Sequence, residues 1–392
     1  MLGRSSRRLA LWTIVVGAVL AVPVHSAAAE PRPTAAASVQ GGPAARAAEL
    51  VEDMSIAEQA ASVIMGHIPT TDPVALSAYM AQGFGGFILM GANIPGTVQE
   101  LQTVTSSLVA DPSTPPLIAI DQEGGIVSRL GSDAFAGSTT LKSEPVAATA
   151  AAFTARAALV AQAGITVNFG TIADVTADPS SFIFGRALGT DPQGAADRVA
   201  AATSAQEQFL ASTLKHFPGH GAAPGDSHHA IPSTGESLDQ WRSADAVPFI
   251  AGIDAGASLL MFGHLAYTAV DTAPASLSAR WHEIARADLG FDGVIVTDDL
   301  GMLQSSGIVE YADPVANAVT ALGAGNDLVL MIAGSTPETA GQMAAGIVQA
   351  VQSGVLSEER LADAATRVLT LRLSLSAEDA DWTLCPQCEP VS

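Results

Sequence analysis

The stretch Ala-Ser-Thr-Leu-Lys-His-Phe-Pro-Gly-His-Gly-Ala-Ala-Pro-Gly-Asp-Ser-His, residues 211–228, decides the fold that we expect. Residues 211–214 form a short run of small and apolar side chains, which is typical of a buried strand. From Lys215 onward, three glycines and two prolines interrupt the chain. They exclude a helix, because Pro costs about 3 kcal/mol and Gly about 1 kcal/mol in a helix interior. The stretch therefore predicts a strand that ends in a long polar loop, where α/β proteins hold their functional residues.

Eight short apolar runs recur along the chain and alternate with stretches that are long enough for a helix. This alternation predicts a parallel sheet, and strands that are apolar throughout need both faces covered. Eight such units fit one closed (β/α)8 barrel of the TIM type. An open doubly wound sheet is the alternative, but no Gly-x-Gly-x-x-Gly follows the first run, so a dinucleotide site is not indicated. The expected strands are residues 62–65, 86–90, 117–120, 165–169, 211–214, 258–261, 294–297 and 327–331, and the expected helices include residues 45–61, 97–108, 147–163, 194–209, 238–255, 314–322, 337–351 and 357–373.

The beginning of the chain is typical of an exported protein. Residues 1–29 combine three arginines with an apolar segment that is short for a membrane span of about 20 residues, and they end in small side chains, so we expect a signal peptide. The paired arginines in Ser6-Arg7-Arg8-Leu9 suggest the twin-arginine route. A retained N-terminal anchor is the alternative. We expect a linker rich in Pro and Ala over residues 30–44, the barrel over residues 45–375 and a tail over residues 376–392.

The charge and the cysteines of the chain narrow its expected partners. The formal net charge of −22 argues against nucleic acid, because nucleic-acid binding depends on neutralising phosphates with Lys and Arg. The two cysteines, Cys385 and Cys388, lie in the tail, and in an exported protein we expect a local disulfide between them rather than half of a zinc site. We expect a monomer without an obligatory protein partner, located outside the cell or in its envelope.

Polar and charged residues follow the apolar runs, as expected for a barrel whose active site lies at the carboxyl ends of its strands. A ring of carboxylates, Arg, Lys and His suits a substrate with many hydroxyl groups, which accept and donate charge-assisted hydrogen bonds. The ring comprises Asp121, Gln122, Glu123 and Arg129 after the third run, Asp174 and Arg186 after the fourth, residues 215–228 after the fifth, His264 after the sixth, and Asp298 and Asp299 after the seventh.

Two positions in this ring suit the cleavage of a glycosidic bond, which needs a proton donor for the leaving oxygen and a second group at the anomeric carbon. Asp298 directly follows an apolar run, so a rigid strand would aim it into the mouth, whereas Asp299 fits better as a helix cap. Asp226 and His228 lie two residues apart on a loop, and histidine gives and takes protons around neutrality. The alternative is a zinc site, although the His-Glu-x-x-His pattern is absent. Its ligands would come from His216, His220, His228 and His229.

Four segments, taken in order, resemble the bacterial β-N-acetylglucosaminidases of glycoside hydrolase family 3. Lys-His-Phe-Pro-Gly-His-Gly-x4-Asp-Ser-His at residues 215–228 is similar to the signature loop of these enzymes. Asp-Gln-Glu-Gly-Gly at residues 121–125, followed by Arg129, resembles their first sugar-binding segment. Arg186-x-x-Gly189-x-Asp191-Pro192 resembles their arginine motif, and Val296-Thr297-Asp298-Asp299-Leu300-x-Met302 resembles their nucleophile strand. The resemblance covers residues 45–373.

The resemblance implies a retaining, exo-acting hydrolase that needs no cofactor and no metal. It would remove terminal non-reducing GlcNAc from GlcNAc–MurNAc fragments of peptidoglycan. Asp298 would be the nucleophile, and His228, paired with Asp226, would protonate the leaving oxygen and then activate water. The terminal sugar would be bound by Asp121, Arg129, Arg186, Lys215 and His216.

Three other functions remain as alternatives at this point. Two are enzymes of the same family, a GlcNAc phosphorylase and a β-glucosidase. The third is a non-catalytic cell-wall sugar-binding protein, which the presence of Asp298 and the Asp226–His228 pair disfavours.

Overall fold

The computed structural model describes residues 42–376 of the chain. The predicted signal peptide, most of the predicted linker and the tail with Cys385 and Cys388 lie outside the described residues. Helix α1 begins at Pro43, so residues 43 and 44, which we predicted as linker, are helical. Within residues 42–376, no helix is both long enough and apolar enough to cross a membrane.

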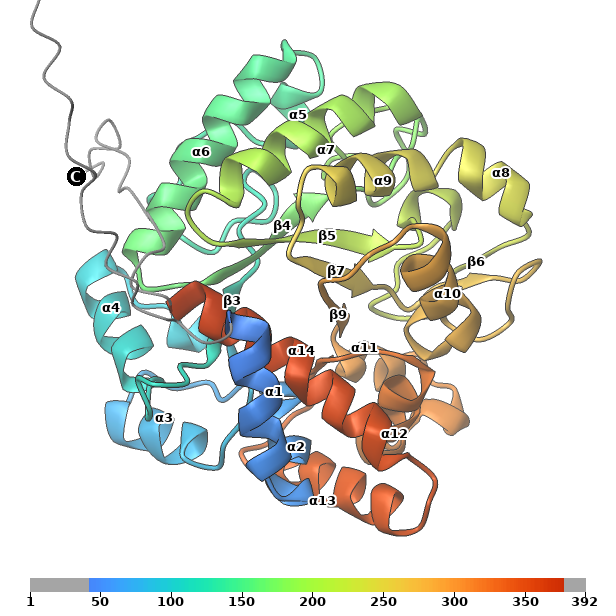
Figure 1. The fold of residues 1–392 in the computed structure, drawn as a ribbon. Coiled ribbons are helices and arrows are strands. Elements are labelled where there is room, and N and C mark those ends of the chain that lie inside the picture. Colours follow the sequence, from blue (N-terminus) through green and yellow to red (C-terminus); the bar gives the residue numbers. More distant parts are fainter. Residues whose placement is uncertain (1–41, 377–392) are drawn as a thin grey trace, which may run out of the picture. The chain divides into compact units, whose positions relative to one another are not determined.

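Eight parallel strands form one sheet that curls into a barrel with helices around it (Figure 1). Neighbouring strands follow the order β10-β1-β2-β3-β4-β5-β7-β9, and the paired strands of this sheet are parallel to each other. The predicted (β/α)8 barrel is therefore confirmed, and each of the eight apolar runs overlaps one of the strands. The strands are β1 (Ile64–Gly66), β2 (Gly86–Leu89), β3 (Leu117–Ile120), β4 (Val167–Ile172), β5 (Ala211–Phe217), β7 (Leu259–Phe262), β9 (Val294–Thr297) and β10 (Val329–Leu330).

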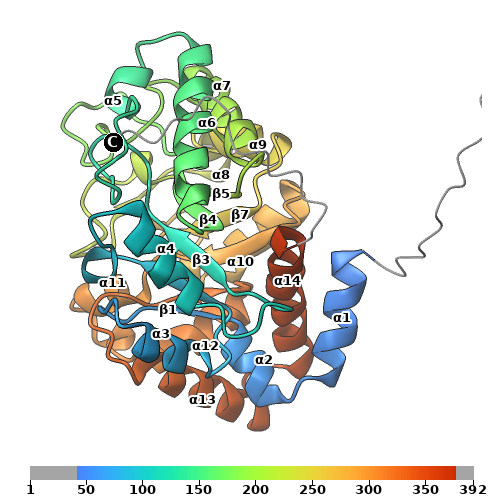
Figure 2. The same ribbon diagram turned by 90° about the vertical axis from the view of Figure 1, so that its left-hand side faces the viewer.

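The helices occupy the stretches between the strands and lie outside the barrel (Figures 1 and 2). The helices predicted over residues 45–61 and 238–255 are each divided into two shorter helices. The first breaks at Ser55, whose side chain accepts from the backbone N–H of Glu58 and caps the second part. The helices are α1 (Pro43–Asp53), α2 (Ile56–Ser62), α3 (Pro73–Met80), α4 (Val98–Ser107), α5 (Ser138–Leu141), α6 (Val146–Gln162), α7 (Pro192–Gln206), α8 (Leu238–Ser243), α9 (Ala246–Asp254), α10 (Ala279–Glu283), α11 (Leu300–Ser305), α12 (Pro314–Ala324), α13 (Thr339–Gln352) and α14 (Glu358–Ser376).

The apolar character of the strands follows from the two cores that they separate. In β3, Leu117 and Ala119 belong to the core inside the barrel, whereas Ile118 and Ile120 pack in the core between the sheet and the helices. Successive side chains of a strand point to opposite faces, so a strand between two cores is apolar at every position. This is why the strands appear in the sequence as continuous apolar runs.

The barrel closes between β9 and β10, where the two strands are joined by one isolated bridge and not by a continuous ladder. A single bridge joins Val296 to Leu328, with the N–H of Thr297 donating to the carbonyl of Leu328 at 3.1 Å. The buried carboxylate of Asp327, next to this bridge, accepts from Arg286 and, at 2.7 Å, from Arg360 of α14. The N–H groups of Asp327 and Leu328 also donate to the carbonyl of Ile295, at 2.8 and 3.1 Å, so backbone hydrogen bonds and side-chain ion pairs hold the closure together.

Two features beyond the eight strands shape the mouth of the barrel. Strand β5 continues to Phe217, so Lys215 and His216, which we predicted in the loop, belong to the strand. Strands β6 (Ser233–Thr234) and β8 (Ala266–Tyr267) form a separate parallel pair, which the sequence did not indicate. The mouth is thus bounded by extended segments as well as by loops.

Candidate active site

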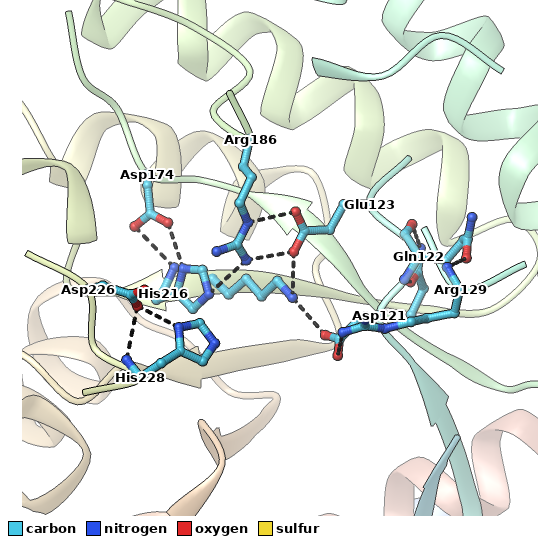
Figure 3. A network of polar contacts seen from close by, with 11 residues as sticks. Asp121, Gln122, Glu123, Arg129, Asp174, Arg186, His216, Asp226 and His228 are labelled. Carbon is cyan, nitrogen blue, oxygen red and sulfur yellow. Dashed lines mark hydrogen bonds and ion pairs between the residues drawn. The ribbon is translucent and has the colours of Figure 1, made fainter. Parts of the chain in front are cut away.

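The polar residues that follow the strands gather at the carboxyl end of the barrel, as expected. Side chains from the ends of β3, β4 and β5 form one network of hydrogen bonds and ion pairs (Figure 3). The loops after β7 and β9 add His264 and Asp298 beside it. Five of the eight predicted site residues take part directly in this network, namely Asp121, Arg129, Arg186, Lys215 and His216.

Lys215 and Arg186 are held by two carboxylates from the segment after β3. The ammonium group of Lys215 donates to Asp121 at 2.8 Å and lies 2.9 Å from Glu123. Glu123 accepts two further bonds from the guanidinium of Arg186, at 3.0 and 2.7 Å, and Figure 3 shows its carboxylate facing Arg186. The Glu123 side chain is 2% exposed, so this bidentate pair is shielded from water.

The charges in this network favour one another's ionised forms. Burial would raise the pKa of Asp121 and of Glu123, but the charges of Lys215 and Arg186 together lower both pKa values. Burial would lower the pKa of Lys215, but the two carboxylates raise it. These groups therefore carry full charges at neutral pH and can make charge-assisted hydrogen bonds to sugar hydroxyls.

Arg129 and Gln122 complete the segment after β3. Arg129 donates to Asp121 at 3.3 Å. The side-chain oxygen of Gln122 accepts from the backbone N–H groups of Arg129 and Leu130, at 2.8 and 3.0 Å, and fixes the turn. Its amide nitrogen donates to Asp133, which also accepts from the fully buried Arg156 of α6 at 2.6 Å. Buried polar contacts therefore hold the loop that carries Asp121.

A buried aspartate orients His216. Nδ1 of His216 lies 2.7 Å from a carboxylate oxygen of Asp174, whose other oxygen accepts from the backbone N–H groups of His216 and His220. Burial would raise the pKa of Asp174, but His216 and these hydrogen bonds lower it. The ionised carboxylate places the proton of His216 on Nδ1 and leaves Nε2 facing Arg186 at 3.3 Å.

Asp298 lies at the end of β9, directly beside this network. Its backbone N–H donates to the carbonyl of Phe262, and its carboxylate accepts from the N–H of Asp299 at 2.8 Å. Burial would raise the pKa of Asp298, but His216 and His264 lower it, so it is an anion at neutral pH. Asp299 caps α11, as predicted, by accepting from Gly301.

Asp226 and His228 lie on the loop that follows β5, and they contact each other. Nδ1 of His228 lies 2.5 Å from Oδ1 of Asp226, with 55% and 41% of the two side chains exposed. Partial burial would raise the pKa of Asp226, but the hydrogen bonds from His228 lower it. The Asp226–His228 pair is therefore exposed to solvent, whereas the contacts of Asp174 are buried.

The structure does not bring His228 into contact with Asp298. Within residues 42–376, His228 has hydrogen bonds only to Asp226, and its ring lies 6.5 Å from that of Phe182. Asp298 directly follows β9, and His228 lies on the loop after β5; strands β5 and β9 flank β7, so the ends of these two strands are about 10 Å apart at a strand spacing of about 4.8 Å.

Three residues of the site were noted in the sequence without an assigned role, and the structure shows what they contact. Glu123 joins Lys215 to Arg186, and Asp174 orients His216. His264 is buried between the Ser276 hydroxyl, 2.7 Å from Nδ1, and the Asp299 carbonyl, 2.9 Å from Nε2. The charge balance of the sequence could have indicated the roles of Glu123 and Asp174. Three cations lie at the mouth, and they need more anions than Asp121 and Asp298 provide.

The zinc site that we considered has no support in the geometry. Across the part of the chain that the structure describes, no three His, Cys, Asp or Glu side chains are arranged to hold a metal ion. His228 and His229 are exposed, whereas His216 and His220 are buried. His216 is instead committed to Asp174.

Comparison with known proteins identifies the family. Residues 69–371 match the family described as "Glycosyl hydrolase family 3 N terminal domain". A β-hexosaminidase from Xanthomonas campestris pv. campestris is 36% identical over 307 residues, covering 73% of this chain and 90% of its own, and one from Pseudomonas aeruginosa is 36% identical over 255 residues, or 63% and 74%.

Solved structures agree with this match. A family 3 β-N-acetylglucosaminidase from Paenibacillus sp. str. FPU-7 has a TM-score of 0.76 and 28% identity over 83% of this chain and 64% of its own. A β-N-acetylhexosaminidase from Beutenbergia cavernae has a TM-score of 0.71 and 29% identity over 82% and 99%. With its barrel, its polar mouth and these relatives, the chain belongs to glycosyl hydrolase family 3 and is a glycoside hydrolase.

Proposed function

We propose that this enzyme is an exo-acting, retaining β-N-acetylglucosaminidase that removes terminal non-reducing GlcNAc. One observation carries the proposal. An ionised Asp298 lies at the end of β9, beside a network of buried charged groups that suits a sugar. The names of the β-hexosaminidase and β-N-acetylglucosaminidase relatives support the same activity.

The network would bind the terminal sugar. Asp121 and Arg129 lie on one strand end, Lys215 and His216 on another, and Arg186 bridges toward His216. Carboxylates accept from hydroxyl groups, and ammonium and guanidinium groups donate to hydroxyl and acetamido oxygens. Because these groups already hold one another in place, little side-chain freedom is lost when the sugar binds.

The cleavage would proceed in two steps. The carboxylate of Asp298 attacks the anomeric carbon and forms a glycosyl-enzyme ester, while the bond to the leaving oxygen breaks and protonated His228 gives that oxygen a proton. Neutral His228 then takes a proton from water, whose oxygen attacks the same carbon and frees Asp298. Two inversions at one carbon retain its configuration, and both residues return to their first states. The anionic Asp226 would orient the His228 ring.

We infer the natural substrate from the sequence resemblance, and the location of the enzyme from the predicted signal peptide. We propose that the natural substrates are GlcNAc–MurNAc fragments of peptidoglycan and that the enzyme acts in cell-wall turnover as a monomer. The arginine-rich, apolar residues 1–29 support export to the envelope or beyond.

The test compares p-nitrophenyl β-N-acetylglucosaminide with the corresponding β-glucoside. We expect hydrolysis of the first at a much higher kcat/KM, with the β-anomer of GlcNAc appearing first in the NMR spectrum. Asp298→Ala should lower kcat by more than about 10³-fold, as expected when a catalytic nucleophile is lost. Near-normal activity in this variant, or initial release of the α-anomer, would refute the assignment.

Phosphorolysis is the second candidate activity, because a histidine as the acid/base group would admit phosphate in place of water. A neutral imidazole carries no negative charge in its deprotonated form, so it repels a phosphate acceptor less than a carboxylate would. Product analysis on GlcNAc–MurNAc, with and without phosphate, separates the two. Free GlcNAc in both cases indicates hydrolysis, and GlcNAc 1-phosphate in the presence of phosphate indicates a phosphorylase.

A further inference from the structure

His220 is a buried histidine at the site to which the proposed mechanism gives no role. It opens the short 3-10 turn His220–Ala222 after β5, and only 1% of it is exposed. Its backbone N–H donates to Asp174 at 2.6 Å. Among the described residues, neither Nδ1 nor Nε2 of its ring has a hydrogen-bond partner.

An unpaired imidazole in this position weakens the fold. Burying a polar group without a partner costs folding free energy, so a ring without nitrogen atoms would be more favourable in the same space. The surroundings would suit such a ring, because Phe182 packs edge-on against His220 with ring centres 4.6 Å apart. A costly polar group at a site of this kind indicates a function that the folded chain alone does not show.

The ring lies close to the proposed catalytic groups, since the charge of Asp298 acts on it. The ring of His216 is 6.0 Å away, within the buried network beside Asp298. The ring of Phe182, 4.6 Å from that of His220, also lies 6.5 Å from that of His228. A sugar held between Asp298 and His228 would therefore lie close to this ring.

The ring of His220 is neutral at working pH. Burial lowers the pKa of His220 to about 4, and the negative charge of Asp174 opposes this only in part. A neutral imidazole has one N–H donor and one bare nitrogen acceptor. This combination matches a sugar hydroxyl or an acetamido group, each of which offers complementary atoms, and it avoids placing another full charge beside Arg186.

We propose that His220 contacts the substrate directly and hydrogen-bonds through its neutral ring to a hydroxyl or the acetamido group of the bound N-acetyl sugar. The proposal rests on the proposed function, since it names a further binding residue of the same site. It predicts that the ring nitrogens matter for binding and turnover and not for the stability of the fold.

The test replaces the ring with one of similar shape that cannot hydrogen-bond. His220→Phe should keep or raise the thermal midpoint, while kcat/KM on p-nitrophenyl β-N-acetylglucosaminide falls roughly tenfold, as expected for the loss of about one hydrogen bond. Inhibition by free GlcNAc should weaken by a similar factor. His220→Asn, which keeps a donor and an acceptor, should recover part of the loss.

A matched control is available in His282 of α10. It is also buried, with a pKa lowered to about 4 by burial, and its ring stacks on Phe262 at 4.1 Å. Its Nδ1 is bonded to the carbonyl of Ser278 within its own helix segment, away from the sugar-binding network. His282→Phe should leave kcat/KM and GlcNAc inhibition unchanged.

The outcomes separate this proposal from the proposed function. Wild-type enzyme that does not hydrolyse the substrate contradicts the proposed function. Active wild type with unchanged kcat/KM and GlcNAc inhibition in His220→Phe overturns only the role of His220. If His220→Phe does not fold, His220→Asn decides, because wild-type inhibition by GlcNAc together with a lowered thermal midpoint would identify a purely structural histidine.

Discussion

The replacement of Glu123 by glutamine tests whether the buried charge network orients the sugar-binding residues. The carboxylate of Glu123 receives two bonds from Arg186 and one close contact from Lys215. Glutamine has the same shape but no charge, and it can accept at one atom only. Lys215 retains Asp121, whereas Arg186 keeps one bond at most to the glutamine oxygen, besides the contact to His216 at 3.3 Å.

The expected effect is large, because the charge that is removed is buried. Removing one partner of a buried ion pair costs about 3–5 kcal/mol, since the remaining charge lies in a medium that solvates it poorly. For a domain of this length, each kcal/mol lowers the thermal midpoint by about 1.5 °C, so we expect a loss of about 5–7 °C. Activity should fall roughly 10–100-fold in kcat/KM, because Arg186 loses its bidentate partner and Lys215 loses one of its two carboxylates.

Differential scanning calorimetry and steady-state kinetics on p-nitrophenyl β-N-acetylglucosaminide measure the two effects. Glu207→Gln is the control, because this half-buried carboxylate accepts from Ser212 and Ser258 at the opposite end of β5 and β7. The control should lower the thermal midpoint and leave kcat/KM unchanged. A Glu123→Gln enzyme with the wild-type midpoint and the wild-type KM would refute the reasoning.

Two further predictions concern the loop after β5 and the pH dependence of stability. His228→Ala should reduce turnover of substrates with poor leaving groups far more than that of the p-nitrophenyl glycoside, and equal losses would argue against a general acid. Burial, followed by the charge of nearby Glu236, raises the pKa of Asp245 to about 8, against about 3.9 in an unfolded chain. Between these values the folded state binds the extra proton, so stability falls as pH rises from about 4 to 8. Asp245→Asn should flatten this decline in thermal midpoints measured across that range, and an unchanged slope would contradict the assignment.

The strands of the barrel could be predicted because each lies between two apolar cores. Residues 117–120 and 294–297 are strands at the predicted positions, since every side chain in them is buried. The end of β5 could not be predicted, because Lys215 and His216 are charged or polar and resemble a loop. They remain in the strand because Asp121, Glu123 and Asp174 supply partners inside the mouth, and only the folded barrel brings these partners near.

The members of the site could be predicted better than their contacts. The order of polar residues after the runs indicated Asp121, Arg186, Lys215 and Asp298, since parallel strands end at the same face. The role of Glu123 could not be predicted, because the sequence does not show which way a side chain turns after its strand ends. The same limit applies to Asp174, whose contact with His216 joins residues 42 positions apart.

The closure of the barrel has a consequence for the order in which the protein becomes functional during synthesis. Arg360, which forms an ion pair with Asp327 beside the Val296–Leu328 bridge, belongs to α14, the last helix of the described residues. Every sugar-binding and catalytic side chain is made before it. A nascent chain that stops short of α14 would therefore contain the complete catalytic set but would lack one of the ion pairs that hold the ring closed, so we expect full alignment of the site only after α14 has been made.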